Sequence, residues 1–217
     1  MASLTPASRR TGFSMPMLID FLISGGPVMV PIGVCSVIAL ATFLERLWSL
    51  RRVKVIPESL SVQLMLLLKE KRWDDARILC QAQPVALARL VEVALEVRQA
   101  PRAVIKERLE EVGRREAAEM ERWIPVVGTI AAIAPLLGLL GTVGGMILTF
   151  QVIQQQGLGD AGSLAGGISQ ALVTTFAGLS VGIPAVVANR YLLSRVDGLL
   201  LELEEAALGV LEMLVDY

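Results

Sequence analysis

Two long stretches of the chain carry no ionisable side chain. Neither Asp, Glu, Lys, Arg nor His lies between Arg122 and Asp160, and none lies between Asp160 and Arg190. A helix needs about 20 apolar residues to cross the hydrocarbon core of a bilayer. Both stretches are longer than that, so the sequence predicts an integral membrane protein rather than a soluble domain.

A third apolar run covers Pro27–Leu44 and ends in a basic cluster. This run is long and lacks a small-residue cleavage site, so we expect a retained span rather than a signal peptide. The composition agrees, since hydrophobic residues make up 54% of the chain and the mean hydropathy is +0.62. We therefore expect an all-α protein with three spans, at residues 26–50, 124–153 and 167–193.

Most of the charge lies in the middle segment, residues 51–123. Prolines divide it into an expected helical hairpin (SLSVQLMLLLKEKRWDDARILCQ) and a longer amphipathic helix (RAVIKERLEEVGRREAAEMERW). Apolar residues repeat at helical spacing in this helix and again in the C-terminal segment 194–217; they are Ile105, Leu109, Val112, Ala117, Met120, Ile124, and Leu200, Leu203, Ala207, Leu211 and Leu214. We expect the two stripes to pack together and to extend spans two and three as a helical stalk.

The basic residues predict the orientation in the membrane. Lys and Arg follow the first and third spans closely, whereas the loop 154–166 contains neither. Cytoplasmic loops carry the excess of Lys and Arg. We therefore expect the middle segment and the C-terminus in the cytoplasm, with the short loop and the N-terminal segment 1–25 on the other side. Arg9 and Arg10 oppose this orientation weakly.

Small residues line one face of spans two and three, which predicts close helix packing. Gly141-x-x-x-Gly145 and Gly178-x-x-x-Gly182 are spacings that let helix backbones approach in lipid. The residues that we assign to packing are Gly138, Gly141, Gly145, Gly178, Gly182, Pro135 and Pro184. For any one glycine, packing alone is a sufficient interpretation.

Polar residues within the same spans are more informative. They include Thr129, Thr142, Gln170, Thr174 and Thr175. A lone membrane threonine usually bonds to its own helix, but several polar residues on neighbouring spans indicate a polar interior or a wetted pathway. An ion-driven machine generally uses an intramembrane ionisable group. Spans two and three have none, so a proton-carrying acid would have to come from another chain.

The sequence offers little for enzyme or metal chemistry. It contains no histidine, and its two cysteines have no metal-ligand spacing. GLLGTVGG matches neither a dinucleotide-binding nor a phosphate-binding glycine motif. We therefore expect no catalytic residue, metal or cofactor, and the net charge of −1 gives no reason to propose nucleic acid as a partner.

Two segments resemble a known family. TIAAIAPLLGLLGTVGGMILTF (Thr129–Phe150) and GISQALVTTFAGLSVGIPAVVANRYL (Gly167–Leu192) are similar to the signature spans of the ExbB/TolQ/MotA proton-channel family, and of its ExbB/TolQ branch in particular. The resemblance implies a homopentameric ring in the bacterial inner membrane. In that ring the second and third spans line a pore, and the external loop and N-terminus are periplasmic.

The resemblance also implies a partner and a set of pore residues. A dimer of a single-span protein of the ExbD/TolR type would thread the pore and supply a membrane aspartate. Thr129 and Thr175 correspond to the family's pore threonines, and Thr142 belongs to the Gly-Thr-Val core. Gln170 stands where some relatives carry a glutamate, which leaves a direct proton-relay role there in doubt. Thr174 lies beside these positions.

The function expected from these features is a motor subunit driven by the proton-motive force. It would energise TonB-type transport, Tol-type envelope maintenance or motility. Two alternatives stay open at this point: a structural membrane scaffold without ion conduction, and a solute-transporter subunit with broken helices. The absence of an inverted repeat between spans two and three argues against the transporter.

Overall fold

The computed structural model describes residues 24–156 and 161–215. The predicted N-terminal segment 1–25 lies almost entirely outside this range, and so do Arg9, Arg10 and the middle of the loop 154–166. Within the two described ranges there is no strand, which confirms the all-α class. The helices are α2 (Met29–Ser49), α3 (Arg52–Val55), α4 (Glu58–Lys69), α5 (Trp73–Ala82), α6 (Ala86–Glu96), α7 (Arg102–Glu121), α8 (Ile124–Gln156) and α9 (Ala161–Val215).

Three of these helices, α2, α8 and α9, are long and apolar enough to cross a membrane. This confirms the three predicted membrane helices. Large apolar side chains on them remain exposed, for example Val30 at 70%, Leu136 at 62% and Leu172 at 65%. In water such exposure would be costly, whereas acyl chains cover it in a bilayer.

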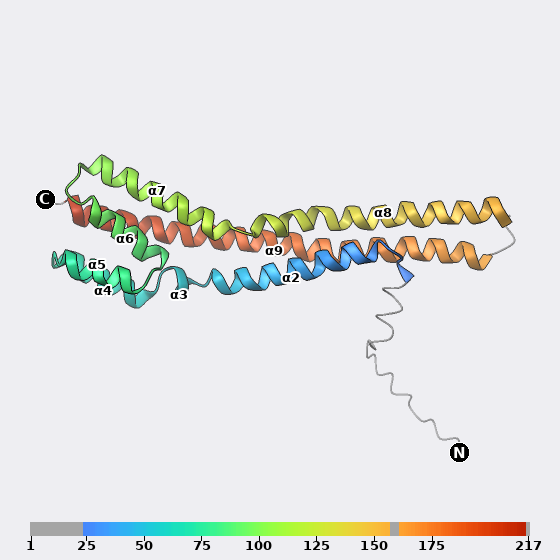
Figure 1. The fold of residues 1–217 in the computed structure, drawn as a ribbon, viewed down its shortest axis with the longest axis horizontal. Coiled ribbons are helices and arrows are strands. Elements are labelled where there is room, and N and C mark those ends of the chain that lie inside the picture. Colours follow the sequence, from blue (N-terminus) through green and yellow to red (C-terminus); the bar gives the residue numbers. More distant parts are fainter. Residues whose placement is uncertain (1–23, 157–160, 216–217) are drawn as a thin grey trace, which may run out of the picture. The chain divides into compact units, whose positions relative to one another are not determined.

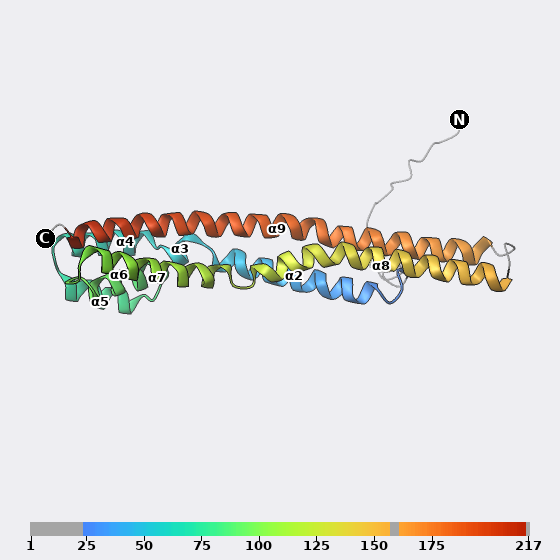
Figure 2. The same ribbon diagram turned by 90° about the horizontal axis from the view of Figure 1, so that it is seen from above.

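The chain divides into two compact units, which we describe separately. The first comprises the described residues up to Ser36 together with Ala132–Ile183, and the second comprises Val37–Ala131 and Pro184–Tyr217. In the first unit α8 runs antiparallel to the beginning of α9 (Figure 1). In the second unit α7 lies alongside the C-terminal half of α9 in both views (Figures 1 and 2).

The second unit has one apolar core, built from helices of period 3.6. Leu60, Leu64 and Leu68 form the buried stripe of α4, and α6 buries most of its length. The stripes predicted for α7 and the C-terminal half of α9 contribute to this same core; their buried members are Ile105, Leu109, Met120, Ile124, Leu203, Leu211 and Leu214. Residues of both predicted stripes are therefore buried in the same core, and the direct packing of one stripe on the other stays a prediction.

The junction between α7 and α8 differs from the expected continuous extension of span two. The helix stops at Glu121, and Trp123 has a φ of 70°, in the left-handed region. Pro125 follows directly. In a continuous helix its ring would collide with the carbonyl of Glu121, and it has no N–H to donate. The chain therefore breaks and restarts, with Pro125 in the first turn of α8, where proline is well tolerated.

Span three does continue without a break into the C-terminal segment. A single helix, α9, covers Ala161–Val215 with Pro184 inside it, and α8 similarly contains Pro135. A proline within a membrane helix is tolerated because neighbouring groups can satisfy the freed carbonyl.

An ion pair between a half-exposed arginine and a buried glutamate connects α6 to α7. The Glu116 side chain is 6% exposed, and both of its carboxylate oxygens accept hydrogen bonds of 2.5 Å from the Arg89 guanidinium. Arg89 also donates to the carbonyl of Pro84 at 2.9 Å. The hydrogen bond to Glu116 raises the pKa of Arg89 above its usual value. A two-pronged contact of this kind fixes the relative register of the two helices.

Removal of the Arg89 side chain should destabilise the second unit. In Arg89→Met the buried Glu116 carboxylate loses its partner, which we expect to cost about 2 kcal/mol of unfolding free energy. Adding Glu116→Leu should recover most of that loss. Thermal unfolding followed by tryptophan fluorescence in detergent measures both. The matched control is Arg72→Met, since Arg72 pairs with Glu70 and Asp75 only at the surface; a change there as large as that of Arg89→Met would contradict the prediction.

The thiol of Cys80 should resist alkylation. Cys80 is 2% exposed in α5, and burial, with a smaller contribution from the charge of Glu92, raises its pKa to about 11. At pH 8 the thiol is therefore protonated, and the thiolate is the reactive form. In a Cys35→Ala variant, a maleimide at pH 8 should label Cys80 only after denaturation. Rapid labelling of the folded protein would contradict this.

Candidate functional site

Two threonine hydroxyls meet between α8 and α9 in the first unit. The Oγ1 atoms of Thr142 and Thr175 are hydrogen-bonded to each other, and either can be the donor. Thr142 also reaches the carbonyls of Gly138 and Ala171, both at 3.3 Å, and Thr175 reaches the Gly138 carbonyl at 3.2 Å. Both side chains are half-buried. Together they form a small interhelical cluster of two hydroxyls and two backbone carbonyls.

The other threonines of these helices bond to their own helix. Thr129 donates to Pro125 O at 2.8 Å, and Thr149 to Gly145 O at 2.9 Å. Thr174 reaches Gln170 O and Ala171 O, both at 3.0 Å. This is the usual back-bonding of a lone hydroxyl. The Thr142–Thr175 pair is therefore set apart by geometry from its neighbours of the same residue type.

Close backbone approach brings the pair together. A Cβ atom at Gly138 would lie 3.1 Å from the Thr175 Cα atom, and one at Gly178 would lie 2.5 Å from the Ala134 carbonyl oxygen. Two turns after Gly138, a Cβ at Gly145 would lie 2.8 Å from the Gly167 carbonyl oxygen. Larger residues at these positions would push the two backbones apart and separate the hydroxyls.

Thr174 and Gln170 lie toward the beginning of α2, and Thr174 also bonds to the Ala171 carbonyl that Thr142 reaches. Thr174 is fully buried, and a Cβ atom at Gly141 or Gly25 would meet its side chain. A Cβ atom at Gly26 would collide with the amide nitrogen of Gln170. Gly26 has a φ of 69°, which favours glycine. These two residues thus cover the Gly25–Gly26 turn that leads into α2.

The other residues predicted for the pore or for helix packing lie in both units of the structure. Thr129 is exposed on α8 in the second unit, so the structure does not bring it into the Thr142–Thr175 cluster. Gly182 is buried and Pro135 half-buried in the first unit, whereas Pro184 is exposed in the second. The contact of Gly25 and Gly26 with α9 was not anticipated. The dipeptide directly before an apolar run was the available signal, because paired glycines permit both a turn and a close approach.

The cluster is chemically neutral. From Ile124 to Gln156 and from Ala161 to Asn189 no side chain is ionisable. No group of three or more His, Cys, Asp or Glu residues suited to a metal is found among the residues that the structure describes. A hydroxyl both donates and accepts a hydrogen bond. The pair can therefore hydrogen-bond to a protonated or an ionised acid brought beside it, but it cannot itself carry a charge at neutral pH.

Comparison with known proteins agrees with the resemblance of the two spans. The chain is 35% identical over 182 residues to an ExbB-like biopolymer transport protein of Synechocystis sp., covering 82% of this chain and 72% of that protein. It is 30% identical over 161 residues to the Tol-Pal system protein TolQ of Haemophilus influenzae, covering 73% and 67%. The biopolymer transport protein ExbB of Aquifex aeolicus is 36% identical over 86 residues, which are 40% of this chain and 58% of that protein.

The family match extends beyond the two spans. Residues 81–205 match the MotA/TolQ/ExbB proton channel family, so the matched region also includes α6 and α7. That region is more than half of the 217 residues, and the relatives named above belong to the ExbB and TolQ branch. The chain therefore belongs to the MotA/TolQ/ExbB proton channel family.

Proposed function

We propose that this protein is a subunit of an inner-membrane motor driven by the proton-motive force. It conducts protons together with a single-span partner of the ExbD/TolR type and energises a periplasmic or envelope process. The observation that carries the proposal is the interhelical Thr142–Thr175 hydroxyl pair, placed in two helix segments, 124–156 and 161–189, that contain no ionisable side chain. Names of relatives favour biopolymer transport or a Tol-Pal system as the process driven.

The neutrality of the site explains why a partner is needed. A proton crossing the bilayer core requires a group that binds and releases it, and in membrane proteins this is an ionisable residue. The partner supplies a carboxyl group, in the proposed arrangement, and the hydroxyl pair offers it hydrogen bonds in either protonation state. Each proton yields about 2.3 kcal/mol per 100 mV of membrane potential. This free energy is comparable with the net contribution of one or two hydrogen bonds, so weak contacts to hydroxyl groups suit a step in which the partner's carboxyl group gains and loses a proton.

The proposal assigns different roles to the polar residues. Thr142 and Thr175 face the proton path, and Thr129 is a pore threonine separate from this pair. Thr174 and Gln170 support the path by holding the Gly25–Gly26 turn against α9, since Thr174 is fully buried. The chain forms a homopentameric ring, with its middle segment and C-terminus in the cytoplasm and its short loop in the periplasm. It acts as a channel and motor component rather than as an enzyme.

Removal of the hydroxyl pair should abolish most of the proton flow. We expect Thr142→Val and Thr175→Val to lower the proton flux by about tenfold or more, because each leaves hydrogen-bonding groups unsatisfied along the path. Flux is measured with a pH-sensitive dye after the complex, isolated with its native partner, is placed in liposomes under a potassium diffusion potential.

Matched controls separate the role of the hydroxyl from helix packing. Thr142→Ser and Thr175→Ser keep the hydroxyl and should retain most of the flux. Thr42→Val makes the same chemical change in α2 and should have little effect. A scaffold without conduction would give wild-type assembly and no difference between the valine and serine variants, and that result would reject the proposal.

Mild purification should also recover the partner. We expect the protein to co-purify with a small single-span protein that has an Asp or Glu within its span, at about two copies for every five of this chain. Native mass spectrometry measures the ratio, and peptide sequencing identifies the span. Recovery of this chain alone, with full proton flux, would show that the acid is not supplied in this way.

A further inference from the structure

One side of α7 carries a regular exposed row. Its residues are Val104, Arg108, Glu111, Arg115 and Ala118, which we call the α7 flank, and all five are exposed. They follow one another at steps of four and three residues. Such a 3.5-residue spacing is typical of a helix that packs lengthwise on another helix. Three positions are charged and two are small and apolar.

A matching row lies on the C-terminal half of α9. It consists of Leu201, Glu205, Leu208 and Glu212, the α9 flank, again at steps of four and three. Leu201 is 66% exposed and Leu208 is 56% exposed, although both lie far beyond the apolar part of the helix. Two leucines seven residues apart on a polar surface, with a glutamate after each, indicate a helix-packing seam that no described segment of this chain covers. Leu208 lies at the edge of this seam, where it also lines a groove between α9 and α7.

The charges on the two flanks are complementary. The α7 flank has two arginines and one glutamate, whereas α9 has no Lys or Arg after Arg195. Among the described residues Arg115, Glu205 and Glu212 form no ion pair. Arg108 pairs only with Glu111 of its own helix, at 2.9 Å on the surface. Arg115 thus has no ion pair among the described residues, and Arg108 is paired only within its own helix, so both are suited to meeting the carboxylates of the α9 flank across an interface.

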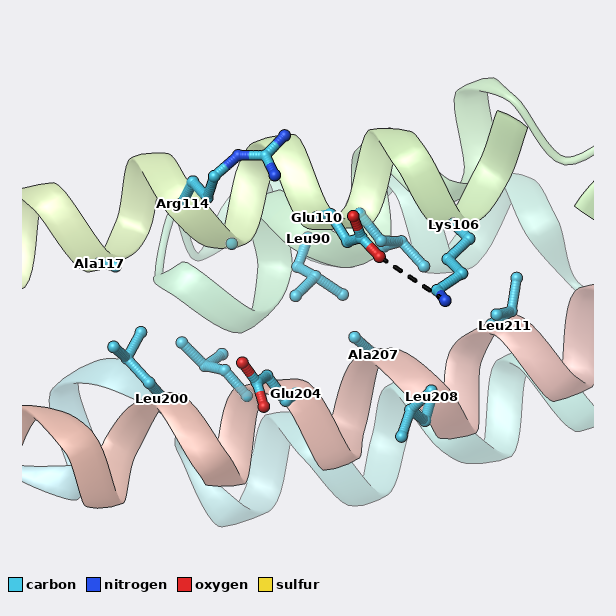
Figure 3. A pocket seen from close by; sticks show the side chains of 13 residues that line it. Leu90, Lys106, Glu110, Arg114, Ala117, Leu200, Glu204, Ala207, Leu208 and Leu211 are labelled. Carbon is cyan, nitrogen blue, oxygen red and sulfur yellow. Dashed lines mark ion pairs between the residues drawn. The ribbon is translucent and has the colours of Figure 1, made fainter. Parts of the chain in front are cut away.

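The two rows also stand at the same level along the helices. Within one chain, α7 and α9 run antiparallel on either side of a groove of about 490 Å³, lined by residues of both helices. In Figure 3 Ala117 lies opposite Leu200, and Lys106 lies near Leu211. By this register Arg108 falls between Glu205 and Glu212, and Arg115 falls within one turn of Glu205.

The flanks do not meet within one chain. At 100° per residue, the α7 flank lies on the opposite side of α7 from the groove residues Lys106, Gly113 and Ala117. A rotation about an axis parallel to the helices keeps every residue at its level. Such a rotation can bring the α7 flank of one copy against the α9 flank of the next, with Arg108 and Arg115 beside Glu212 and Glu205.

We propose that the α7 flank and the α9 flank form the contact between neighbouring copies of this chain outside the bilayer. The contact is head-to-tail, so its repetition closes a ring when the rotation from one copy to the next is a whole fraction of a full turn. The leucines supply the apolar seam, and the four charged residues set the level and the order of the copies. This inference rests on the proposed function in taking the assembly to be a ring, but it concerns only what holds the cytoplasmic parts together.

Charge exchange tests the contact. Arg108→Glu with Arg115→Glu, and separately Glu205→Arg with Glu212→Arg, place like charges across the interface, and each pair should cause loss of the assembled form. All four changes together should restore it. Native mass spectrometry in mild detergent measures the assembly. Lys69→Glu and Asp74→Arg are controls, because both residues are exposed on α4 and α5 and form no ion pair among the described residues.

A cross-linking experiment distinguishes a contact between copies from one within a chain. Two differently tagged copies are co-expressed in a Cys35→Ala background, one with Arg115→Cys and the other with Glu205→Cys. A bifunctional maleimide should join the two tags, and the same background without the new cysteines reports any reaction of buried Cys80.

The outcomes separate this inference from the proposed function. Restored assembly in the fourfold variant, with a cross-link between tags, supports the contact. Intact assembly in both reversal pairs, or intact assembly without a cross-link, overturns it. Neither result depends on proton flux. If the contact fails while Thr142→Val and Thr175→Val still lose flux, only the interface is wrong; if the contact holds while those variants conduct normally, only the proposed function is wrong.

Discussion

The approach of two helix backbones at glycine is the constraint on which the membrane part of this protein depends. At Gly138 and Gly178 the backbones of α8 and α9 leave no space for a side chain between them. Lipid gives no hydrophobic driving force for helix association, so such van der Waals contact and interhelical hydrogen bonds must supply it. The same closeness allows the Thr142 hydroxyl to reach both Thr175 and the carbonyl of Ala171 on the other helix. The same close approach of the two helices therefore provides both the packing contact and the hydrogen bonds of the hydroxyl pair.

The second unit is held together differently, as in a water-soluble protein. Its core is a continuous apolar cluster from α4, α5, α6, α7 and α9. The Arg89–Glu116 pair adds register between α6 and α7 at a position where Glu116 is almost fully buried. Surface ion pairs such as Arg72 with Asp75 contribute little, so the core and the Arg89–Glu116 pair determine how the helices of the second unit fit together.

The sequence was sufficient for the number of spans, because the absence of ionisable residues over such lengths has one physical meaning in a chain of this composition. It was also sufficient for the apolar stripes of α7 and α9, since a repeat of 3.6 residues can be seen in a short stretch of sequence.

The break at Trp123 could be explained by Pro125 but was not predicted, because proline near the end of a predicted helix is compatible with either a kink or a restart. Which threonines pair across helices could not be predicted, because it depends on the rotation of each helix about its axis. The burial of Thr174 and the contact of Gln170 with the Gly25–Gly26 turn depend on the same rotation.

The Thr142–Thr175 pair has one further property. Either hydroxyl can be the donor, and whichever one accepts still has a carbonyl within reach for its own hydrogen, at 3.2 or 3.3 Å. Both arrangements make the same number of hydrogen bonds, and they interconvert by rotating two hydroxyl hydrogens without moving a heavier atom. The donor and acceptor roles of the two hydroxyls can thus be exchanged, and the pair itself favours neither direction of the hydrogen bond. Any direction of transfer past it must be imposed from outside, by the electric field across the membrane and by whatever stands next to the pair.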